Sequence, residues 1–247
     1  MKLLISIDDT DNLHTPGSGQ LAARLADSLV ENNLATACAS ISRHQLYVHD
    51  DIRYTSHNSA MCFTAEINGS PCRSVIEHAQ LFLAQQSAEG SDPGLAVAVE
   101  SPDLREDLLN TFGLAAKKNI LTKHDAYETA RSAGVHLSEH GGDGGGIIGA
   151  LAGIGLRLNG SDGRFRGWTK AGKVGEIIDC SVLRELGGVQ GVVNAAGEDI
   201  RGDESVFITD KRIKSVLLDH RRVIPLISGA SAGAAWATLS PAESKRF

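Results

Sequence analysis

The stretch that most constrains the fold is the glycine-rich segment EHGGDGGGIIGAL, which begins at Glu139. Five of the six residues from 141 to 146 are glycine, and an apolar run follows at once, so the pattern predicts a loop that leads into a helix. Each glycine in ordered structure costs about 0.5–1 kcal/mol of backbone entropy, so five of them need a reason. Close approach to an anionic ligand such as a phosphate is one reason, and a merely flexible loop is the alternative. The segment lacks the Lys of a P-loop and does not match a clean dinucleotide-binding fingerprint.

A second unusual stretch is LLISIDDTDN at residues 3–12, in which three acids follow a short apolar run. The run predicts a buried strand, and Asp8, Asp9 and Asp11 come where that strand ends. Ligands of open α/β sheets gather at the carboxyl ends of strands. Clustered carboxylates there suit Mg²⁺, a hard ion that combines one or two carboxylates with phosphate oxygens. The other interpretation is a solvated acidic turn.

A helix is expected to start close to this acidic turn. The segment HTPGSGQLAARL places Gly17, Ser18 and Gly19 at a helix N-terminus, where bare backbone N–H groups can bind phosphate. Gly and Ser are also ordinary residues at a helix start, so the signal is weak by itself. The neighbouring acids, with Thr10 among them, are what favour a phosphate site here.

The remaining pattern predicts an α/β (mixed α+β) protein. Strands are expected at 35–48, 60–67, 95–100, 135–140 and 163–168, and helices at 19–33, 74–86, 101–112, 123–134 and 179–188. Three short strands are expected at 205–210, 214–219 and 222–227, before a tail rich in small residues that is expected to be partly loose.

Composition argues against several classes of protein. The net charge is −6, so no global basic field attracts nucleic acid. The four cysteines never form a C-x-x-C pair, which indicates buried thiols of a reducing compartment rather than a disulfide frame or a zinc site. No run approaches the ~20 apolar residues that span a bilayer, and the N-terminal apolar run is too short for a signal peptide. We therefore expect a cytoplasmic protein with no membrane partner.

Three separated stretches together resemble one family, the archaeal isoleucine-tRNA agmatidine synthetases. The family opens with an apolar strand and D-D-T-D, which residues 8–11 match. It then has an N-x-P-x-K-T-R-G-N-G-A pattern, to which HDDIRYTSHNSAMCF is similar through Thr55, Asn58 and Ala60. It finally carries G-N-G-R-G-[IL]-I-G-A-L-A-A-I-G, which is similar to GGDGGGIIGALAGIG. A looser likeness continues through SVLRELGGVQGVVNAAGED, so the resemblance spans roughly residues 1–210.

The resemblance implies a kinase-like α/β domain that binds ATP and Mg²⁺, with a ferredoxin-like α+β domain inserted or adjacent. Residues 1–60 with 136–175 are assigned to the first, 61–135 to the second, and 176–247 to a C-terminal extension with short strands. The expected catalytic residues are Asp8, Asp9, Thr10 and Asp11, with the three acids as metal ligands. The expected nucleotide- or phosphate-binding residues are Gly17, Ser18, Gly19, Thr55, Asn58, Gly142, Asp143, Gly144, Gly145 and Gly146.

The sequence also departs from the family pattern. The K-T-R of the family is replaced by Tyr54, Thr55 and Ser56, and the Arg of G-R-G by Gly145. Losing cations that steady phosphates can cost orders of magnitude in rate. Candidates to substitute for them are Arg43, Arg53, Arg166 and Lys170. The OB-fold and zinc ribbon with which the family grips tRNA have no counterpart in this sequence.

The first hypothesis is therefore an ATP- and Mg²⁺-dependent phosphotransferase or ligase that acts on a small molecule. The second is a non-catalytic nucleotide sensor, which the missing basic residues favour. The third is a tRNA-modifying subunit; tRNA is not expected as a partner unless a separate protein binds it. The acceptor, the oligomeric state and the ATP bond that is cleaved stay open.

Overall fold

The computed structural model describes residues 1–55, 57–228 and 233–246, and the chain divides into two compact units, Met1–Asn159 and Gly160–Phe247. The first unit contains β1 (Lys2–Asp8), α1 (Ser18–Glu31), β2 (Ala37–Cys38), β3 (Ser42–Gln45), β4 (Ser59–Glu66), α2 (Cys72–Gln86), β5 (Gly94–Val99), α3 (Glu106–Ala115), α4 (Lys123–Ala133), β6 (His136–Glu139) and α5 (Gly146–Asn159). The second contains β7 (Arg164–Phe165), β8 (Ile177–Asp179), α6 (Cys180–Arg184), β9 (Gly191–Val193), β10 (Ser205–Phe207), β11 (Val216–Leu218), β12 (Arg221–Ser228), β13 (Trp236–Thr238) and the 3₁₀ helix η2 (Glu243–Arg246).

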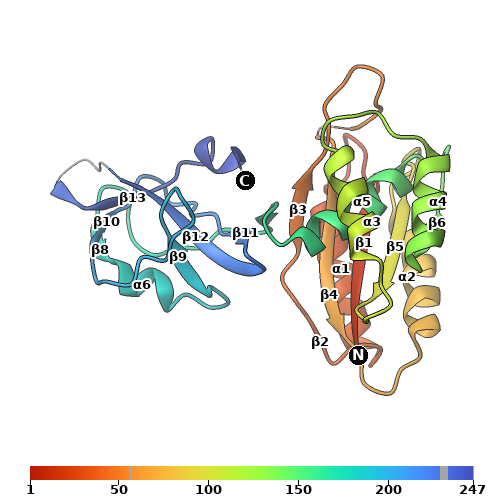
Figure 1. Cartoon of the computed structure of the whole chain (residues 1–247), viewed down its shortest axis with the longest axis horizontal. Coiled ribbons are helices and arrows are strands. Elements are labelled where there is room, and N and C mark those ends of the chain that lie inside the picture. The colour runs from red at the N-terminus through yellow and green to blue at the C-terminus, as the bar shows by residue number, and fades with distance from the viewer. Residues whose placement is uncertain (56, 229–232, 247) are drawn as a thin grey trace. The chain divides into compact units, whose positions relative to one another are not determined.

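The sheet of the first unit has the strand order β6-β5-β1-β4-β3, and β2 also pairs with β4. Every pair in this order is antiparallel, and β1 runs through the middle between β4 and β5 (Figure 1). Successive side chains of a strand point to opposite faces. Leu3 and Leu4 of β1 therefore face opposite ways, yet both are buried, because helices cover both faces of the sheet.

Each face of this sheet carries its own hydrophobic core. On one face, α1 and α2 contribute Leu21, Leu25, Leu29, Val75, Ala79 and Leu83. On the other face, α3, α4 and α5 contribute Leu109, Phe112, Ala126, Ala130, Ile147, Leu151 and Ile154. The apolar stripes along these helices match the faces that they bury, as an amphipathic pattern requires.

Glycines let α5 pack closely on its neighbours. A Cβ at Gly149 would overlap the carboxyl of Asp8, one at Gly153 the hydroxyl of Ser6, and one at Gly155 the backbone carbonyl of Leu109. The glycines that interrupt this apolar helix thus mark its contacts with β1 and α3. In the described part of the chain no helix combines the length and hydrophobicity that a membrane crossing needs.

The second unit is built mainly of short strands in the order β7-β11-β12-β13-β10-β8, with β9 parallel to β12. Its core is formed by apolar residues that include Val192, Val206, Ile208, Ile224 and Leu226. β10, β11 and β12 confirm the three predicted short strands, whereas β8, β9 and β13 have no counterpart in the prediction. Within the tail that was expected to be loose, β13 and η2 are formed, and residues 229–232 and 247 lie outside the described residues.

The mixed α/β class is confirmed, but two local predictions are wrong. The helix expected from residue 101 begins at Glu106, because residues 101–104 form a turn in which the Leu104 amide donates to the Ser101 carbonyl at 3.1 Å. The strand expected at 35–48 is divided into β2 and β3. Three residues lie between Cys38 and Ser42, while only two lie between their partners on β4, Ala65 and Cys62, and this extra residue interrupts the strand.

The observed division into units differs from the expected borders near residues 60, 135 and 175. β4 and β5, which were assigned to a separate ferredoxin-like domain, pair directly with β1 in one sheet. The elements β1-α1-β3-β4-α2-β5 follow a β-α-β-β-α-β order that begins at residue 2, and β6 extends its edge beside β5. The first compact unit therefore continues to Asn159.

Gly155→Ala is expected to destabilise the first unit by about 1–3 kcal/mol, because the added methyl group meets backbone that cannot rotate away. Urea unfolding followed by circular dichroism measures the change. Gly187→Ala is the matched control, since a Cβ there meets nothing and the effect should stay within about 0.5 kcal/mol. Equal stability of the two variants would contradict the role of Gly155 in close packing.

Candidate functional site

The carboxyl group of Asp8 is buried between β1 and α5. Asp8 ends β1, is 9% exposed, and lies against Gly149 of α5. Burial raises the pKa of Asp8 to about 7, and the charges of Asp9 and Asp11 add to the rise. The Asp9 amide, which donates to Oδ1 of Asp8 at 2.9 Å, and the charge of Arg43 oppose it. Asp8 is therefore protonated in mildly acidic solution and loses its proton only around neutral pH, unless a cation binds beside it.

Asp9 and Thr10 carry polar groups that have no hydrogen-bond partner among the described residues. The φ of Asp9 is +50°, in the left-handed region that Asp and Asn tolerate better than most residues. Its carboxylate makes no hydrogen bond within the described residues. Oγ1 of Thr10 is buried, and it also has no hydrogen-bond partner in the described part of the chain. A bound cation or ligand would complete this arrangement, since buried polar groups are normally paired.

The third acid, Asp11, caps the helix that follows. Its Oδ1 accepts hydrogen bonds from the Ser18 amide at 3.2 Å and from the Ser18 hydroxyl at 2.6 Å. A carboxylate at this place complements the partial positive charge of the helix N-terminus. Gly17 is the N-cap residue of α1, and Gly19 lies in its first turn. The predicted phosphate site at the start of α1 is thus beside the acids, but Asp11 already occupies the amide of Ser18.

The structure adds Asp92, which the sequence pattern does not single out because SDPG has the composition of an ordinary turn. Asp92 is 6% exposed, and its Oδ1 accepts from the Asp143 amide at 2.8 Å. Its carbonyl oxygen accepts from the Gly146 amide at 3.0 Å. Burial and then the charge of Asp92 raise the pKa of Asp9 to about 6. Acids from three separate segments therefore meet at the start of α5.

The glycine loop, defined as residues 141–146, is shaped by the protein's own carboxylates. A Cβ at Gly142 would overlap Oδ1 of Asp92, and one at Gly144 would overlap Oε2 of Glu139. Both glycines also have positive φ, +54° and +77°. The four amides of residues 143–146 already donate hydrogen bonds within the protein. The close approach that these glycines permit is therefore to acidic side chains of the chain itself.

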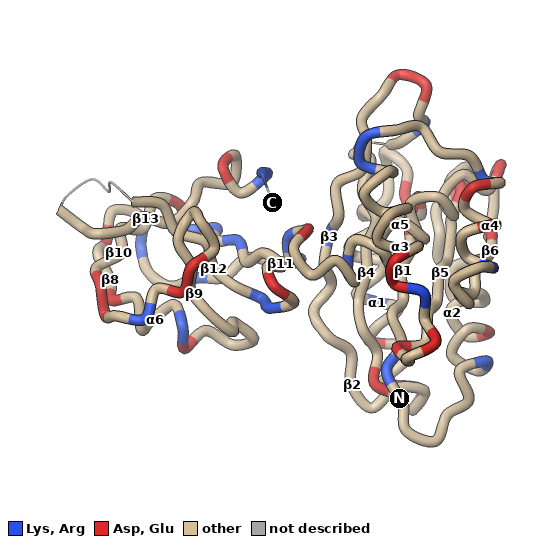
Figure 2. Tube along the Cα trace, viewed as in Figure 1, with Lys and Arg blue, Asp and Glu red and all other residues tan. Residues whose placement is uncertain are grey.

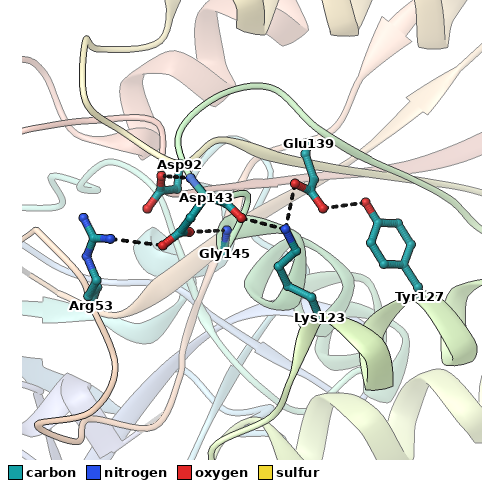
Figure 3. A network of polar contacts seen from close by, with 7 residues as sticks. All are labelled: Arg53, Asp92, Lys123, Tyr127, Glu139, Asp143 and Gly145. Carbon is teal, nitrogen blue, oxygen red and sulfur yellow. Dashed lines mark hydrogen bonds and ion pairs between the residues drawn. The ribbon is translucent and has the colours of Figure 1, made fainter.

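Basic side chains hold the glycine loop from outside (Figure 3). Nη1 of Arg53 donates to Oδ2 of Asp143 at 3.0 Å. Nζ of Lys123, on α4, donates to the carbonyl oxygen of Asp143 at 2.6 Å and to Oε2 of Glu139 at 2.8 Å. The Tyr127 hydroxyl donates to Oε1 of Glu139 at 2.8 Å. The hydrogen bond from Lys123 lowers the pKa of Glu139, so this carboxylate is ionised at neutral pH.

The loop between β3 and β4 contains two residues that were predicted to bind the nucleotide, Thr55 and Asn58, and only Thr55 lies beside the acids. Oγ1 of Thr55 donates to the carbonyl oxygen of Asp11 at 3.0 Å, which ties the loop to the acidic turn. Asn58 bonds within its own loop instead, because its Nδ2 donates to the Tyr47 carbonyl at 2.6 Å. Ser56, which replaces a basic residue of the family pattern, lies outside the described residues.

The site holds more acidic than basic side chains. The acidic ones are Asp8, Asp9, Asp11, Asp92, Glu139 and Asp143, and the basic ones nearby are Arg43, Arg53 and Lys123. Such a cluster attracts a cation and repels a free polyphosphate. It therefore suits a nucleotide only when a metal ion accompanies the phosphates.

A metal site made by protein side chains alone is not preformed. Among the described residues no three His, Cys, Asp or Glu side chains converge as ligands for one ion. Asp8 lies under α5 and Asp11 lies at the start of α1, which keeps the three acids of the turn apart. The open carboxylate of Asp9 and the unpaired hydroxyl of Thr10 fit Mg²⁺ shared with phosphates, since this ion takes only one or two protein carboxylates.

Comparison with known proteins gives a match at the level of the fold. No protein-family model and no curated protein matches the chain. Among solved structures, the chain resembles a complex of TiaS with tRNA and ATP, with a TM-score of 0.54 and 22% identity over 63% of its length. It resembles apo TiaS, an isoleucine-tRNA agmatidine synthetase, with a TM-score of 0.52 and 22% identity over 63% of its length. For the complex of TiaS with tRNA, AMPCPP and agmatine the TM-score is 0.53, with 21% identity over 62% of the chain.

The match covers 36%, 35% and 36% of these three structures, so the chain corresponds to about a third of their length. The resemblance that the three sequence motifs carry is thereby confirmed for the fold. Over 62–63% of its length, the chain shares the fold of about a third of these isoleucine-tRNA agmatidine synthetase structures.

The free energy of unfolding of the first unit is expected to fall as pH rises from about 4 to about 7 in metal-free buffer. Folded Asp8 keeps its proton up to a pKa of about 7, whereas unfolded Asp8 loses it near the usual value of 3.8. The stabilisation is thus present in full below pH 3.8 and lost as pH passes 7. Urea unfolding at a series of pH values measures this slope.

Asp8→Asn should flatten that slope, because the amide does not titrate. Asp103→Asn, at an exposed position of the same unit, is the control and should leave the slope unchanged. A slope that is identical in Asp8→Asn and in the unmutated chain would show that Asp8 titrates at its ordinary pKa.

Proposed function

We propose that the chain is an ATP- and Mg²⁺-dependent enzyme of the phosphotransferase or ligase type. The proposal rests on the negative charge that Asp9, Asp92 and Asp143 bring to the start of α5, near the buried Thr10 hydroxyl, which has no hydrogen-bond partner among the described residues. Negatively charged carboxylates repel free ATP, but they can bind the Mg²⁺ complex of ATP, in which the metal ion neutralises part of the phosphate charge. Structures of the same fold in complex with ATP and AMPCPP support the nucleotide.

Basic groups for phosphoryl chemistry are available near the glycine loop. Arg53 and Lys123 contact Asp143 from two sides, and Arg43 lies close enough to Asp8 to affect its pKa. We propose that Arg53 and Lys123 turn from Asp143 toward the phosphates when the metal–nucleotide complex binds. They would then replace the charge that the family pattern places in the loop itself, where this chain has Gly145.

We propose a small molecule as the acceptor. The first unit, which contains the site, carries 19 Asp and Glu against 11 Lys and Arg, and this charge disfavours a polyanionic acceptor. The site itself, with its excess of carboxylates, is suited to an acceptor that carries an amino or guanidino group. Release of phosphate would indicate cleavage between the β- and γ-phosphates of ATP, and release of pyrophosphate would indicate cleavage between the α- and β-phosphates.

A nucleotide sensor without turnover is the second candidate. It is favoured by the four amides of residues 143–146, which are engaged within the protein rather than directed at a ligand. A sensor would bind the Mg²⁺–ATP complex and release neither phosphate nor pyrophosphate with any acceptor.

Asp9→Asn is expected to lower Mg²⁺-dependent nucleotide turnover by about 100-fold or more, because it removes the open carboxylate charge at the site. Asn tolerates the φ of +50°, so the fold should be retained. Phosphate and pyrophosphate release from ATP, measured with a panel of small amines, gives the rate, and circular dichroism checks the fold.

Asp103→Asn, which changes the same charge at an exposed position outside the site, should keep full activity. Full activity of Asp9→Asn would end the assignment of Asp9 to the metal. Binding of ATP by the unmutated chain without any product would favour the sensor instead.

A further inference from the structure

The two units differ in charge. The first unit has 11 Lys and Arg against 19 Asp and Glu, whereas the second has 13 against 11 (Figure 2). The negative net charge of the chain, which argues against nucleic acid as a partner, is therefore carried by the first unit alone. The second unit is slightly basic, so the charge argument against nucleic acid does not apply to its surface.

Basic residues of the second unit gather in one place, a basic ribbon that we define as residues 164–170 and 211–214. The two segments, RFRGWTK and KRIK, hold six basic residues and no acidic one. They lie side by side, because β7 pairs with β11 and Thr169 forms an antiparallel bridge with Ile213. The exposed basic residues of the ribbon are Arg166, Lys170, Lys211 and Arg212, and Arg212 is also ion-paired with the neighbouring Asp210 at 3.3 Å.

An indole ring lies among these cations. Trp168 is 53% exposed, although large aromatic side chains are usually well buried. Nζ of Lys214 lies 3.8 Å from the ring centroid, and the guanidinium carbon of Arg212 lies 5.4 Å from it. Lys214 is itself fixed, since it donates to the carbonyl oxygens of Phe165 at 3.3 Å and Gly167 at 2.7 Å. The ring is thus held in place against the protein and still faces solvent.

We propose that the basic ribbon binds single-stranded nucleic acid, with a base stacked on Trp168 and the neighbouring phosphates paired with the exposed cations. Proteins that bind single strands with little sequence preference combine these two elements, an aromatic ring for the base and cations along the backbone. This inference does not depend on the nucleotide site of the first unit.

The exposed ring distinguishes this partner from other anionic ones. In a duplex the base faces are hidden in the stack, so the ring would add nothing. An acidic peptide would use the cations but not the ring. An anionic membrane would need further exposed apolar residues beside Trp168, and the other large apolar residues of the ribbon, Phe165 and Ile213, are 3% and 2% exposed.

The test is the binding of the full chain to a short fluorescein-labelled single-stranded RNA, followed by fluorescence anisotropy over a series of salt concentrations. Trp168→Ala should weaken binding at least about fivefold, because base–aromatic stacking contributes ~1–3 kcal/mol per base. The triple variant Arg166→Gln, Lys170→Gln, Lys211→Gln should make the slope of log K against log salt shallower by about 2, since each phosphate contact to a single strand contributes about 0.7.

A second triple variant is the matched control. Lys118→Gln, Arg201→Gln, Lys245→Gln removes three exposed cations outside the ribbon and should bind RNA as the unmutated chain does. The chain has two tryptophans, so Trp236→Phe leaves Trp168 as the only one, and its emission should change when unlabelled RNA is added.

Three results would overturn the proposal. One is the absence of RNA binding at low salt. Another is equal loss of binding in the ribbon variant and the control variant. The third is equally effective competition by duplex RNA, by an acidic peptide or by phosphatidylserine vesicles, which would make the ribbon a general anionic surface.

Discussion

Helix α5 can lie directly on β1 because the residues that face the strand are glycines. Gly149 passes over the buried carboxyl of Asp8, and Gly153 over the hydroxyl of Ser6, so no side chain holds helix and strand apart. This contact places the start of α5 at the end of β1, where the acidic turn begins. The glycine loop is carried to the same place, and Asp92, which bonds two of its amides, completes the site.

The electrostatics of the site follow from this packing. Burial under α5 raises the pKa of Asp8, and burial together with neighbouring acids raises that of Asp9. Carboxyl groups with raised pKa values gain most from a cation, because binding a cation replaces the proton that burial imposes. The charge of Arg53 opposes the rise at Asp9 without cancelling it, since Arg53 is ion-paired with Asp143, and Lys123 is ion-paired with Glu139 at the outer side of the loop. The arrangement is therefore complementary to a metal ion that arrives with its own oxygen ligands.

The local parts of the site could be predicted from the sequence, because the acidic turn and the glycine loop are each contiguous and unusual in composition. Asp92 and Lys123 could not, because each is a single residue in an ordinary turn or helix and acquires its role only from tertiary contact. The glycine loop shows the same limit: its composition predicted close approach to an anion, but the anionic groups next to Gly142 and Gly144 are carboxylates of the chain itself. The charge difference between the two units likewise depends on where the chain divides.

In the proposed function, the acids at the start of α5 bind a nucleotide through a metal ion. Calorimetric titration of the full chain with ATP, in Mg²⁺ and in EDTA, tests it most directly. We expect binding in Mg²⁺ and a loss of at least about tenfold in affinity in EDTA, because a free polyphosphate meets uncompensated carboxylates. Equal affinity in the two buffers, or no binding of millimolar ATP in Mg²⁺, would contradict it.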